Sequence, residues 1–169
     1  TPDGIVISEV LKRQNALIRP PMANLDILFI VLAAEKPTPV LTTLDKLIAI
    51  AEYNSISPVV VVTKADLAEG DAERYAAIYR KAGFSVFVTS SLHNDGISAL
   101  KSYIGDGVKD GVTAAFAGAS GVGKSTLMNA LFPTLSLATS AISEKIGRGK
   151  HTTRHVELFS VGSTAHAGF

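Results

Sequence analysis

The sequence predicts an α/β protein with a mostly parallel sheet and helices on both of its faces. Apolar runs of strand length alternate four times with segments of helical periodicity, which is the pattern of repeated strand–helix units. The runs are nearly continuous, as expected for strands that are covered on both sides. One of them is followed at once by residues 118–126, a phosphate-loop pattern that opens a helix. Together these features predict the three-layer sandwich of P-loop NTPases.

The predicted elements alternate along the chain. Strands are expected at residues 25–32, 58–62, 85–88, 113–117 and 156–161. Helices are expected at residues 40–53, 71–82, 97–104 and 124–132. Residues 133–153 have no clear period, and a loop of that length usually has a function or is disordered.

The N-terminal residues do not follow this strand–helix alternation. Residues 5–11 contain Ile5, Ile7, Val10 and Leu11, and residues 16–18 are apolar. The polar segment Lys12–Asn15 separates them, which predicts two short strands joined by a turn. Pro20-Pro21 then interrupts the pattern, because proline can continue neither a strand ladder nor a helix. We therefore place a boundary near Ala23, with residues 1–22 as the remnant of another domain and 23–169 as the α/β domain. We expect the chain to be truncated at both ends.

The amino-acid composition excludes several classes of protein. The chain has no cysteine, which excludes disulfides and Cys-ligated metals within it and agrees with a cytosolic setting. The longest apolar run, Ile27 to Ala34, is too short to span a bilayer, and no basic-then-apolar leader opens the chain. We therefore expect a soluble, cytoplasmic protein that does not contact membranes, and a monomer. The net charge of +1 means that any nucleic-acid affinity must come from a local patch.

The phosphate-loop segment fits Gly, four residues, then Gly-Lys-Ser/Thr. Glycines let the backbone wrap a phosphate with its N–H groups, the helix start adds a positive dipole end, and Lys124 supplies a charge. Ser125 is then the candidate Mg²⁺ ligand. The candidate phosphate-binding residues are Gly118, Ala119, Ser120, Gly121, Val122, Gly123, Lys124, Ser125 and Thr126.

Two further strand ends carry candidate residues, since ligands bind at the carboxyl ends of parallel strands. After residues 58–62 come Thr63, Lys64 and Asp66, where a carboxylate can accept both the ring N–H and the amino group of guanine. The stem of Lys64 can cover one face of the base. The alternative is a charged turn without a ligand. After residues 85–88 come Ser90 and Ser91, which either approach a base or form a turn and a helix cap.

The third region is a basic loop. Residues 147–155 hold five basic or titratable side chains and no acidic one. One interpretation is a solvated loop. The other is a switch whose threonine coordinates Mg²⁺ and senses the γ-phosphate, with basic residues that face RNA phosphates.

The order of these motifs resembles that of a circularly permuted GTPase, because the base motif at 63–66 precedes the phosphate loop at 118–126. Within that group the chain resembles the RsgA/YjeQ family of small ribosomal subunit biogenesis GTPases. The residues that carry the likeness are Arg19–Asp26, Gly118–Leu127 and Gly147–Arg154.

The resemblance implies binding of GTP and GDP with Mg²⁺, GTP hydrolysis, and a role in late maturation of the small (30S) ribosomal subunit with its rRNA as partner. It assigns Thr63, Lys64 and Asp66 to guanine recognition, Ser90 and Ser91 to the second base-contacting motif, and Ser125 to the metal. It makes Thr153, with Thr152 as the alternative, the switch threonine on Mg²⁺. It also implies that residues 4–19 are the last strands of an N-terminal OB-fold, and that a zinc-binding C-terminal domain of the family is absent from this chain.

The chain departs from the family pattern at three points. Thr63 stands where asparagine is usual, so a shorter hydroxyl contact would replace the side chain that braces the base motif against the phosphate loop. No Asp-Thr-Pro-Gly-like second switch follows residues 156–161, and no glutamine positions a water, so the catalytic residue is unknown. Two alternatives stay open: a permuted GTPase of the large subunit, and a nucleotide-binding module without hydrolysis.

Overall fold

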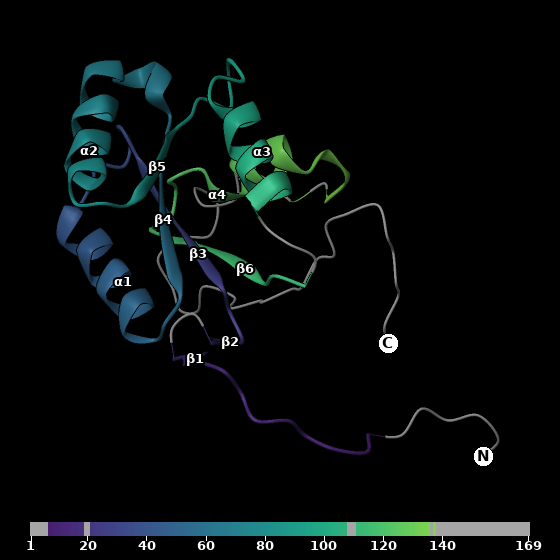
Figure 1. Cartoon of the computed structure of the whole chain (residues 1–169). Helices are drawn as coiled ribbons and strands as arrows, with labels where there is room; N and C mark the ends of the chain where they lie inside the picture. Colours follow the sequence, from purple (N-terminus) through teal and green to yellow (C-terminus); the bar gives the residue numbers. More distant parts are fainter. Residues whose placement is uncertain (1–6, 19–20, 108–110, 136, 138–169) are drawn as a thin grey trace, which may run out of the picture.

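A four-stranded parallel sheet forms the centre of the protein. The computed structural model describes residues 7–18, 21–107, 111–135 and 137 (Figure 1). The strands lie in the spatial order β5–β4–β3–β6, and every neighbouring pair is parallel. Their bounds are β3 Ile27–Ala33, β4 Ser57–Thr63, β5 Ser85–Val88 and β6 Ala114–Gly118. β6 is the last of these strands along the chain, and yet it lies beside β3, which is the first of the four. The chain therefore crosses from β5 at one edge of the sheet to β6 at the other edge before it reaches the phosphate loop.

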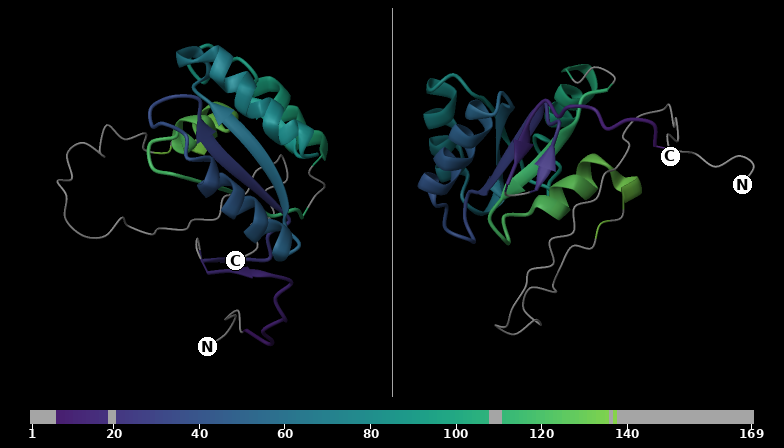
Figure 2. Two further views of the ribbon diagram at one scale, coloured as in Figure 1. Left: turned by 90° about the vertical axis from the view of Figure 1, so that its left-hand side faces the viewer. Right: turned by 90° about the horizontal axis from the view of Figure 1, so that it is seen from below.

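The four α-helices of the described residues cover the sheet in two layers (Figures 1 and 2). Their bounds are α1 Leu41–Tyr53, α2 Glu69–Lys81, α3 Ile97–Gly107 and α4 Lys124–Leu131. Helices α1 and α2 pack on one face, and α3 and α4 pack on the other. The predicted three-layer sandwich is therefore confirmed. Within the described residues, no helix combines the length and the apolar composition that a bilayer crossing requires.

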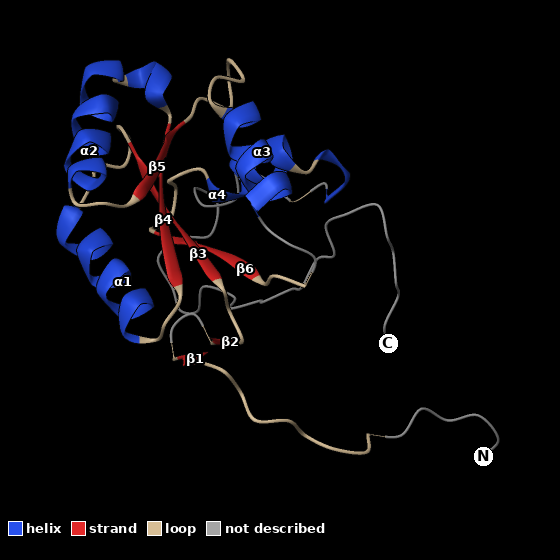
Figure 3. Ribbon diagram, in the orientation of Figure 1, coloured by secondary structure: helices blue, strands red, loops and turns tan. Residues whose placement is uncertain are grey.

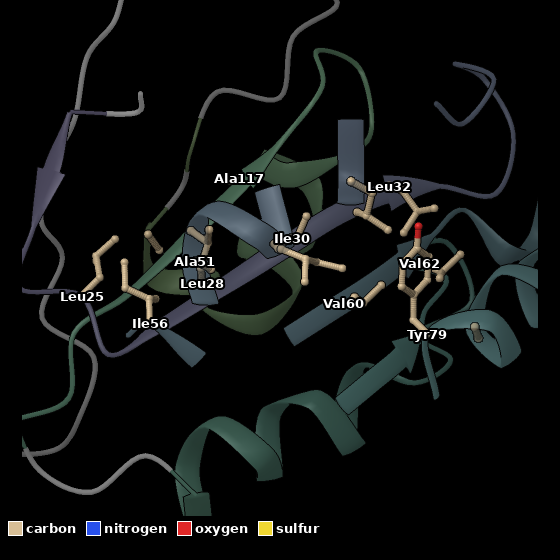
Figure 4. Packing of buried hydrophobic residues seen from close by; sticks show 14 of the residues in the cluster. Leu25, Leu28, Ile30, Leu32, Ala51, Ile56, Val60, Val62, Tyr79 and Ala117 are labelled. Carbon is tan, nitrogen blue, oxygen red and sulfur yellow. The ribbon is translucent and has the colours of Figure 1, made fainter. Parts of the chain in front are cut away.

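The two faces of β3 supply two separate cores, because successive side chains of a strand point to opposite sides. Leu28, Ile30 and Leu32 face α1 and α2 (Figure 4). Phe29 and Val31 face α3 and α4. All seven residues of β3 are buried, which explains why the run is continuously apolar instead of alternating.

The start of β3 differs from its predicted bound for a local reason. Leu25 is buried at 2% exposure, but its backbone pairs with a side chain and not with a strand. Asn15 Nδ2 donates to the Leu25 carbonyl at 2.7 Å, and the Leu25 N–H donates to Asn15 Oδ1 at 2.9 Å. The amide of Asn15 thus takes the place of a strand partner, and β3 begins only at Ile27.

Of the two predicted N-terminal strands, the one at 16–18 is confirmed by a strand at Ala16–Leu17, whereas the one at 5–11 is not found over its described residues 7–11. Residues 7–13 form no strand, and Ile7, Val10 and Leu11 are at least 77% exposed (Figure 3). The observed pairing joins β1, Ala16–Leu17, to β2, Met22–Ala23, in antiparallel register. An isolated strand is unstable without a sheet or a helix to pack on, and residues 7–13 have neither among the described residues.

The domain boundary near Ala23 and the OB-fold remnant stay predictions. Leu17 is only 6% exposed and belongs to the core cluster on the α1 and α2 side. Asn15 and Leu17 therefore contact residues of the α/β domain, although they precede the predicted boundary near Ala23.

The packing of Phe29 yields a stability prediction. Its ring is fully buried and stacks on Phe116 with centroids 4.7 Å apart. Replacing Phe29 by alanine leaves a cavity in the centre of the sheet, and we expect a loss of about 3–5 kcal/mol in the free energy of unfolding. Urea unfolding followed by circular dichroism measures the change. Tyr53→Ala, at a side chain that is 90% exposed, is the control and should change stability by less than about 0.5 kcal/mol.

Candidate nucleotide-binding site

The candidate residues meet at one edge of the sheet, where the parallel strands end. The phosphate loop begins at the last residue of β6, the segment Thr63–Asp66 begins at the last residue of β4, and Ser90 follows β5. The chain is therefore folded so that motifs up to 60 residues apart share one edge, as expected for a ligand site of a doubly wound sheet (Figure 1).

Glycine is required where the phosphate loop leaves the sheet. A Cβ on Gly118 would lie 2.2 Å from the Val31 carbonyl oxygen of β3, closer than any side chain permits. Gly121 and Gly123 have φ angles of 79° and 92°, in the region that favours glycine. The backbone can therefore curl tightly ahead of α4, which is the geometry that an anion-binding loop needs.

The start of α4 leaves backbone donors available. The residue that precedes the helix is Gly123, and no side chain caps this end within the described residues. The first N–H groups of a helix have no partner inside it, and the helix dipole makes this end positive. Ser125, in the first turn, is half-buried and places a hydroxyl beside these donors. A phosphate group fits this donor set.

Lys124 extends back over the loop. Its Nζ donates to the carbonyls of Gly118 at 3.0 Å and Ala119 at 2.7 Å. Burial lowers the pKa of the Lys124 ammonium from its ordinary value. A phosphate beside it would favour the charged form and oppose that effect. The side chain is therefore already held across the loop that a phosphate would enter.

Thr63 connects the base motif to the phosphate loop. Its hydroxyl lies 2.5 Å from the Val122 carbonyl oxygen and 3.1 Å from that of Leu32, and the side chain is 3% exposed. The brace that we expected from asparagine is thus present as a shorter hydroxyl contact. The predicted phosphate-loop residue Val122 has a buried side chain, so its contribution is this backbone carbonyl.

Lys64 makes a second connection between the same segments. It adopts the left-handed conformation, with φ 56° and ψ 37°, before the short 3₁₀ turn Ala65–Leu67. Its Nζ donates to the Gly121 carbonyl at 2.8 Å and also to the carbonyl of Lys36. The ammonium of Lys64 therefore joins the segment at the end of β3 to the phosphate loop.

Asp66 and Ser90 form a hydrogen-bonded pair. Ser90 Oγ donates to Asp66 Oδ1 at 2.6 Å, and Ser90 is 1% exposed whereas Asp66 is exposed. An ionised carboxylate has about four acceptor positions, so it can hold this bond and still accept two more from a base edge. Ser91, which follows, is half-buried at the rim. Ser90 thus orients the carboxylate that we expected to recognise guanine.

Sequence reasoning missed three features of the site. Thr89 is fully buried and its carbonyl accepts the N–H of Ala65, which joins the two base segments. A Cβ on Gly96 would lie 2.0 Å from the Val88 carbonyl oxygen, so this turn needs glycine. The segment Lys36–Pro37 contacts Lys64 and the phosphate loop from the end of β3. The segment Lys36–Pro37 could have been predicted, because it directly follows an apolar run and ligands bind at the carboxyl ends of parallel strands.

Several predicted features lie outside the described residues. They are the strand at 156–161, the basic loop 147–155, Thr153 with its alternative Thr152, and nearly all of the loop 133–153, of which only the 3₁₀ turn Pro133–Leu135 and Leu137 are described. The described residues contain no group of three or more His, Cys, Asp and Glu that could hold a metal ion. The predicted Mg²⁺ site would rest on hydroxyl and phosphate oxygens and would not contain such a group.

The hydroxyl of Thr63 gives a prediction that needs no nucleotide. Thr63→Val keeps the shape of the side chain but removes the donor to the Val122 carbonyl. We expect a loss of about 1–3 kcal/mol in the free energy of unfolding, because a buried acceptor loses its partner. Chemical denaturation measures it. Thr63→Ser keeps the hydroxyl and should lose clearly less; equal losses in the two variants would contradict a role for the hydrogen bond.

The family model for the RsgA GTPase matches residues 10–166, which is most of the chain. Curated relatives named small ribosomal subunit biogenesis GTPase RsgA show similar identities. The protein from Bacillus pumilus is 44% identical over 155 residues, which cover 89% of this chain and 50% of the relative. The protein from Bacillus subtilis is 43% identical over 157 residues, which cover 90% and 51%. The chain thus spans about half the length of these relatives.

Two solved structures have the same fold. YjeQ from Thermotoga maritima matches with a TM-score of 0.66 and 34% identity, over 79% of this chain and 47% of that one. YloQ, described as a circularly permuted GTPase, matches with a TM-score of 0.61 and 38% identity, over 75% and 44%. The order of motifs in this chain, with the base motif on β4 and β5 ahead of the phosphate loop on β6, agrees with that description. The chain therefore belongs to the RsgA GTPase family.

Proposed function

We propose that this protein binds GTP and GDP and hydrolyses GTP in the late maturation of the small ribosomal subunit. The observation that carries the proposal is the hydroxyl of Thr63, which joins a base-recognition segment to a phosphate loop at one edge of the sheet. The names of the curated relatives supply the biological process.

Selection of guanine rests on Asp66. A carboxylate can accept from the N1–H and the 2-amino group of guanine together, whereas the matching edge of adenine presents an acceptor at N1. Ser90 donates to one oxygen of Asp66 and fixes the carboxylate at the rim of the site. A site that is built to accept two such bonds rejects a base that cannot donate them.

Phosphate and metal binding rest on the segment 118–126. The backbone donors ahead of α4 and the ammonium of Lys124 would hold the β- and γ-phosphates, and Ser125 would ligate Mg²⁺. The metal would neutralise charge between the phosphates when it is bound. Thr153 is the proposed second ligand from the chain. Zinc is expected only in a C-terminal domain of the family.

Hydrolysis of GTP would depend on positioning of the reacting groups and on stabilisation of the negative charge on the phosphates in the transition state. Among the described residues, no side chain at the site is placed as a general base, so the catalytic residue is not assigned. The basic residues 147–155 would bind rRNA phosphates, and docking on the small subunit would complete the site and accelerate hydrolysis. The protein would thus act as a monomeric, cytoplasmic timer whose slow intrinsic turnover is stimulated by its substrate particle.

Base selection can be tested by a gain of affinity. In Asp66→Asn the amide N–H can donate to the 2-oxo group of xanthine, and its carbonyl can accept from N1–H. Wild type should bind GDP at least about 100-fold more tightly than ADP or XDP, and the variant should prefer XDP. Isothermal titration calorimetry with Mg²⁺ gives the dissociation constants. Because the variant gains a ligand, loss of folding cannot produce this result. Equal binding of GDP and ADP by wild type would overturn the guanine assignment.

Ribosomal stimulation is tested with purified subunits. We expect release of phosphate from GTP to rise at least about tenfold when small subunits are added, and to stay near its basal rate with large subunits. Lys124→Ala, which removes the ammonium proposed to bind the phosphates, serves as the inactive control. A rate that rises with large subunits only would assign the protein to the alternative particle. Nucleotide binding without phosphate release under any condition would favour a binding module.

A further inference from the structure

We propose that the loop between β3 and α1 is a positioning element of the guanine site, which acts through Lys64. The residues concerned are Lys36 and Pro37. The inference rests on the proposed binding of guanine nucleotides. It adds this loop to the residues of the site, because the motifs of the family resemblance assign no role to it.

The loop is fixed at both ends and contacts the site in the middle. At its start the Ala34 N–H donates to the Thr63 carbonyl at 2.8 Å, and at its end the Thr43 N–H donates to the Val40 carbonyl at 2.9 Å. Between these anchors the carbonyl of Lys36 accepts a hydrogen bond from Lys64 Nζ. Lys36 is held in the left-handed region, with φ 51°, which turns this carbonyl toward the site.

Pro37 places the loop against the phosphate loop. Its Cδ would lie 3.8 Å from a Cβ on Gly121, so the ring lies near the glycine whose carbonyl accepts the second hydrogen bond of Lys64. The ammonium of Lys64 is therefore held between two carbonyls from two separate loops. Lysine has a large rotamer entropy, and two fixed acceptors remove much of that freedom before a ligand binds.

The loop does not pack against the phosphate loop along its whole length. A cavity of about 200 Å³ lies behind it, lined by Pro37–Val40 on one side and by Gly118–Ser120 on the other, with α1 and the end of β3 completing the wall. The contacts of Lys36 and Pro37 thus determine how closely the loop approaches the phosphate loop. The consequence is that the loop controls the position of the Lys64 stem, which lies along the base.

A double-mutant cycle tests this dependence. Pro37→Gly removes the ring and loosens the carbonyl of Lys36, and Lys64→Met removes the ammonium while it keeps an unbranched stem. Titration of N-methylanthraniloyl-GDP gives dissociation constants for wild type, both single variants and the double variant of the 169-residue chain. We expect Pro37→Gly to weaken binding about fivefold in the wild-type background and less than about 1.5-fold in the Lys64→Met background.

Thr38→Gly is the matched control. It also makes the same loop more flexible, at a residue that has no hydrogen bond to Lys64 among the described contacts, and should change affinity by less than about 1.5-fold. Urea unfolding of every variant separates affinity from stability. If Pro37→Gly does not fold, Pro37→Ala replaces it in the same cycle, with the same pattern expected.

The outcomes distinguish this inference from the proposed function. A loss of affinity that is the same with and without the Lys64 ammonium would mean a general structural effect and would overturn the inference. An unchanged affinity in Pro37→Gly would overturn it as well. In both cases GDP binding by wild type would stand. Wild-type protein that binds no guanine nucleotide would refute the proposed function and this inference together.

Discussion

One buried hydroxyl holds the site together. Thr63 ends β4, and its Oγ1 reaches the backbone carbonyl of Val122 in the phosphate loop and that of Leu32 at the end of β3. The side chain of Thr63 is only 3% exposed, so its proton is donated to these carbonyls and not to bulk water. The distance between the base segment and the phosphate segment is therefore set by the fold and not by the ligand. In the proposed function a nucleotide would contact both segments, so this spacing would determine which ligand fits.

The sequence was sufficient for the parts of the fold that depend on burial. β3 packs on both faces, so each of its seven residues is apolar and the strand is recognisable without a partner. The phosphate loop was recognisable for a different reason: its glycines meet steric limits, such as the 2.2 Å approach at Gly118, that no other residue satisfies. In both cases a strong local constraint restricts the residue type directly.

The sequence was not sufficient where a residue acts through its neighbours in space. Ile7, Val10 and Leu11 have the pattern of a strand, but a strand requires a partner that the described chain does not provide. Asn15 looked like part of a polar turn, and its amide instead pairs with the backbone of Leu25. Lys36 contributes a backbone carbonyl, which carries no side-chain signature at all. Such features follow from tertiary contacts, and local patterns do not contain them.

Circular permutation is compatible with the site because the sheet is parallel. In a parallel sheet the carboxyl ends of all strands lie at one edge, whatever the order in which the chain visits them. The base segments on β4 and β5 can therefore precede the phosphate loop on β6 and still lie beside it. What must be preserved is the spatial order β5–β4–β3–β6, in which β3 separates β4 from β6. Thr63 then has to bridge from β4 past the end of β3 to the phosphate loop, and its two acceptors, Leu32 on β3 and Val122 beyond β6, mark that path. Connectivity is thus free to change, whereas the neighbours of β3 are not.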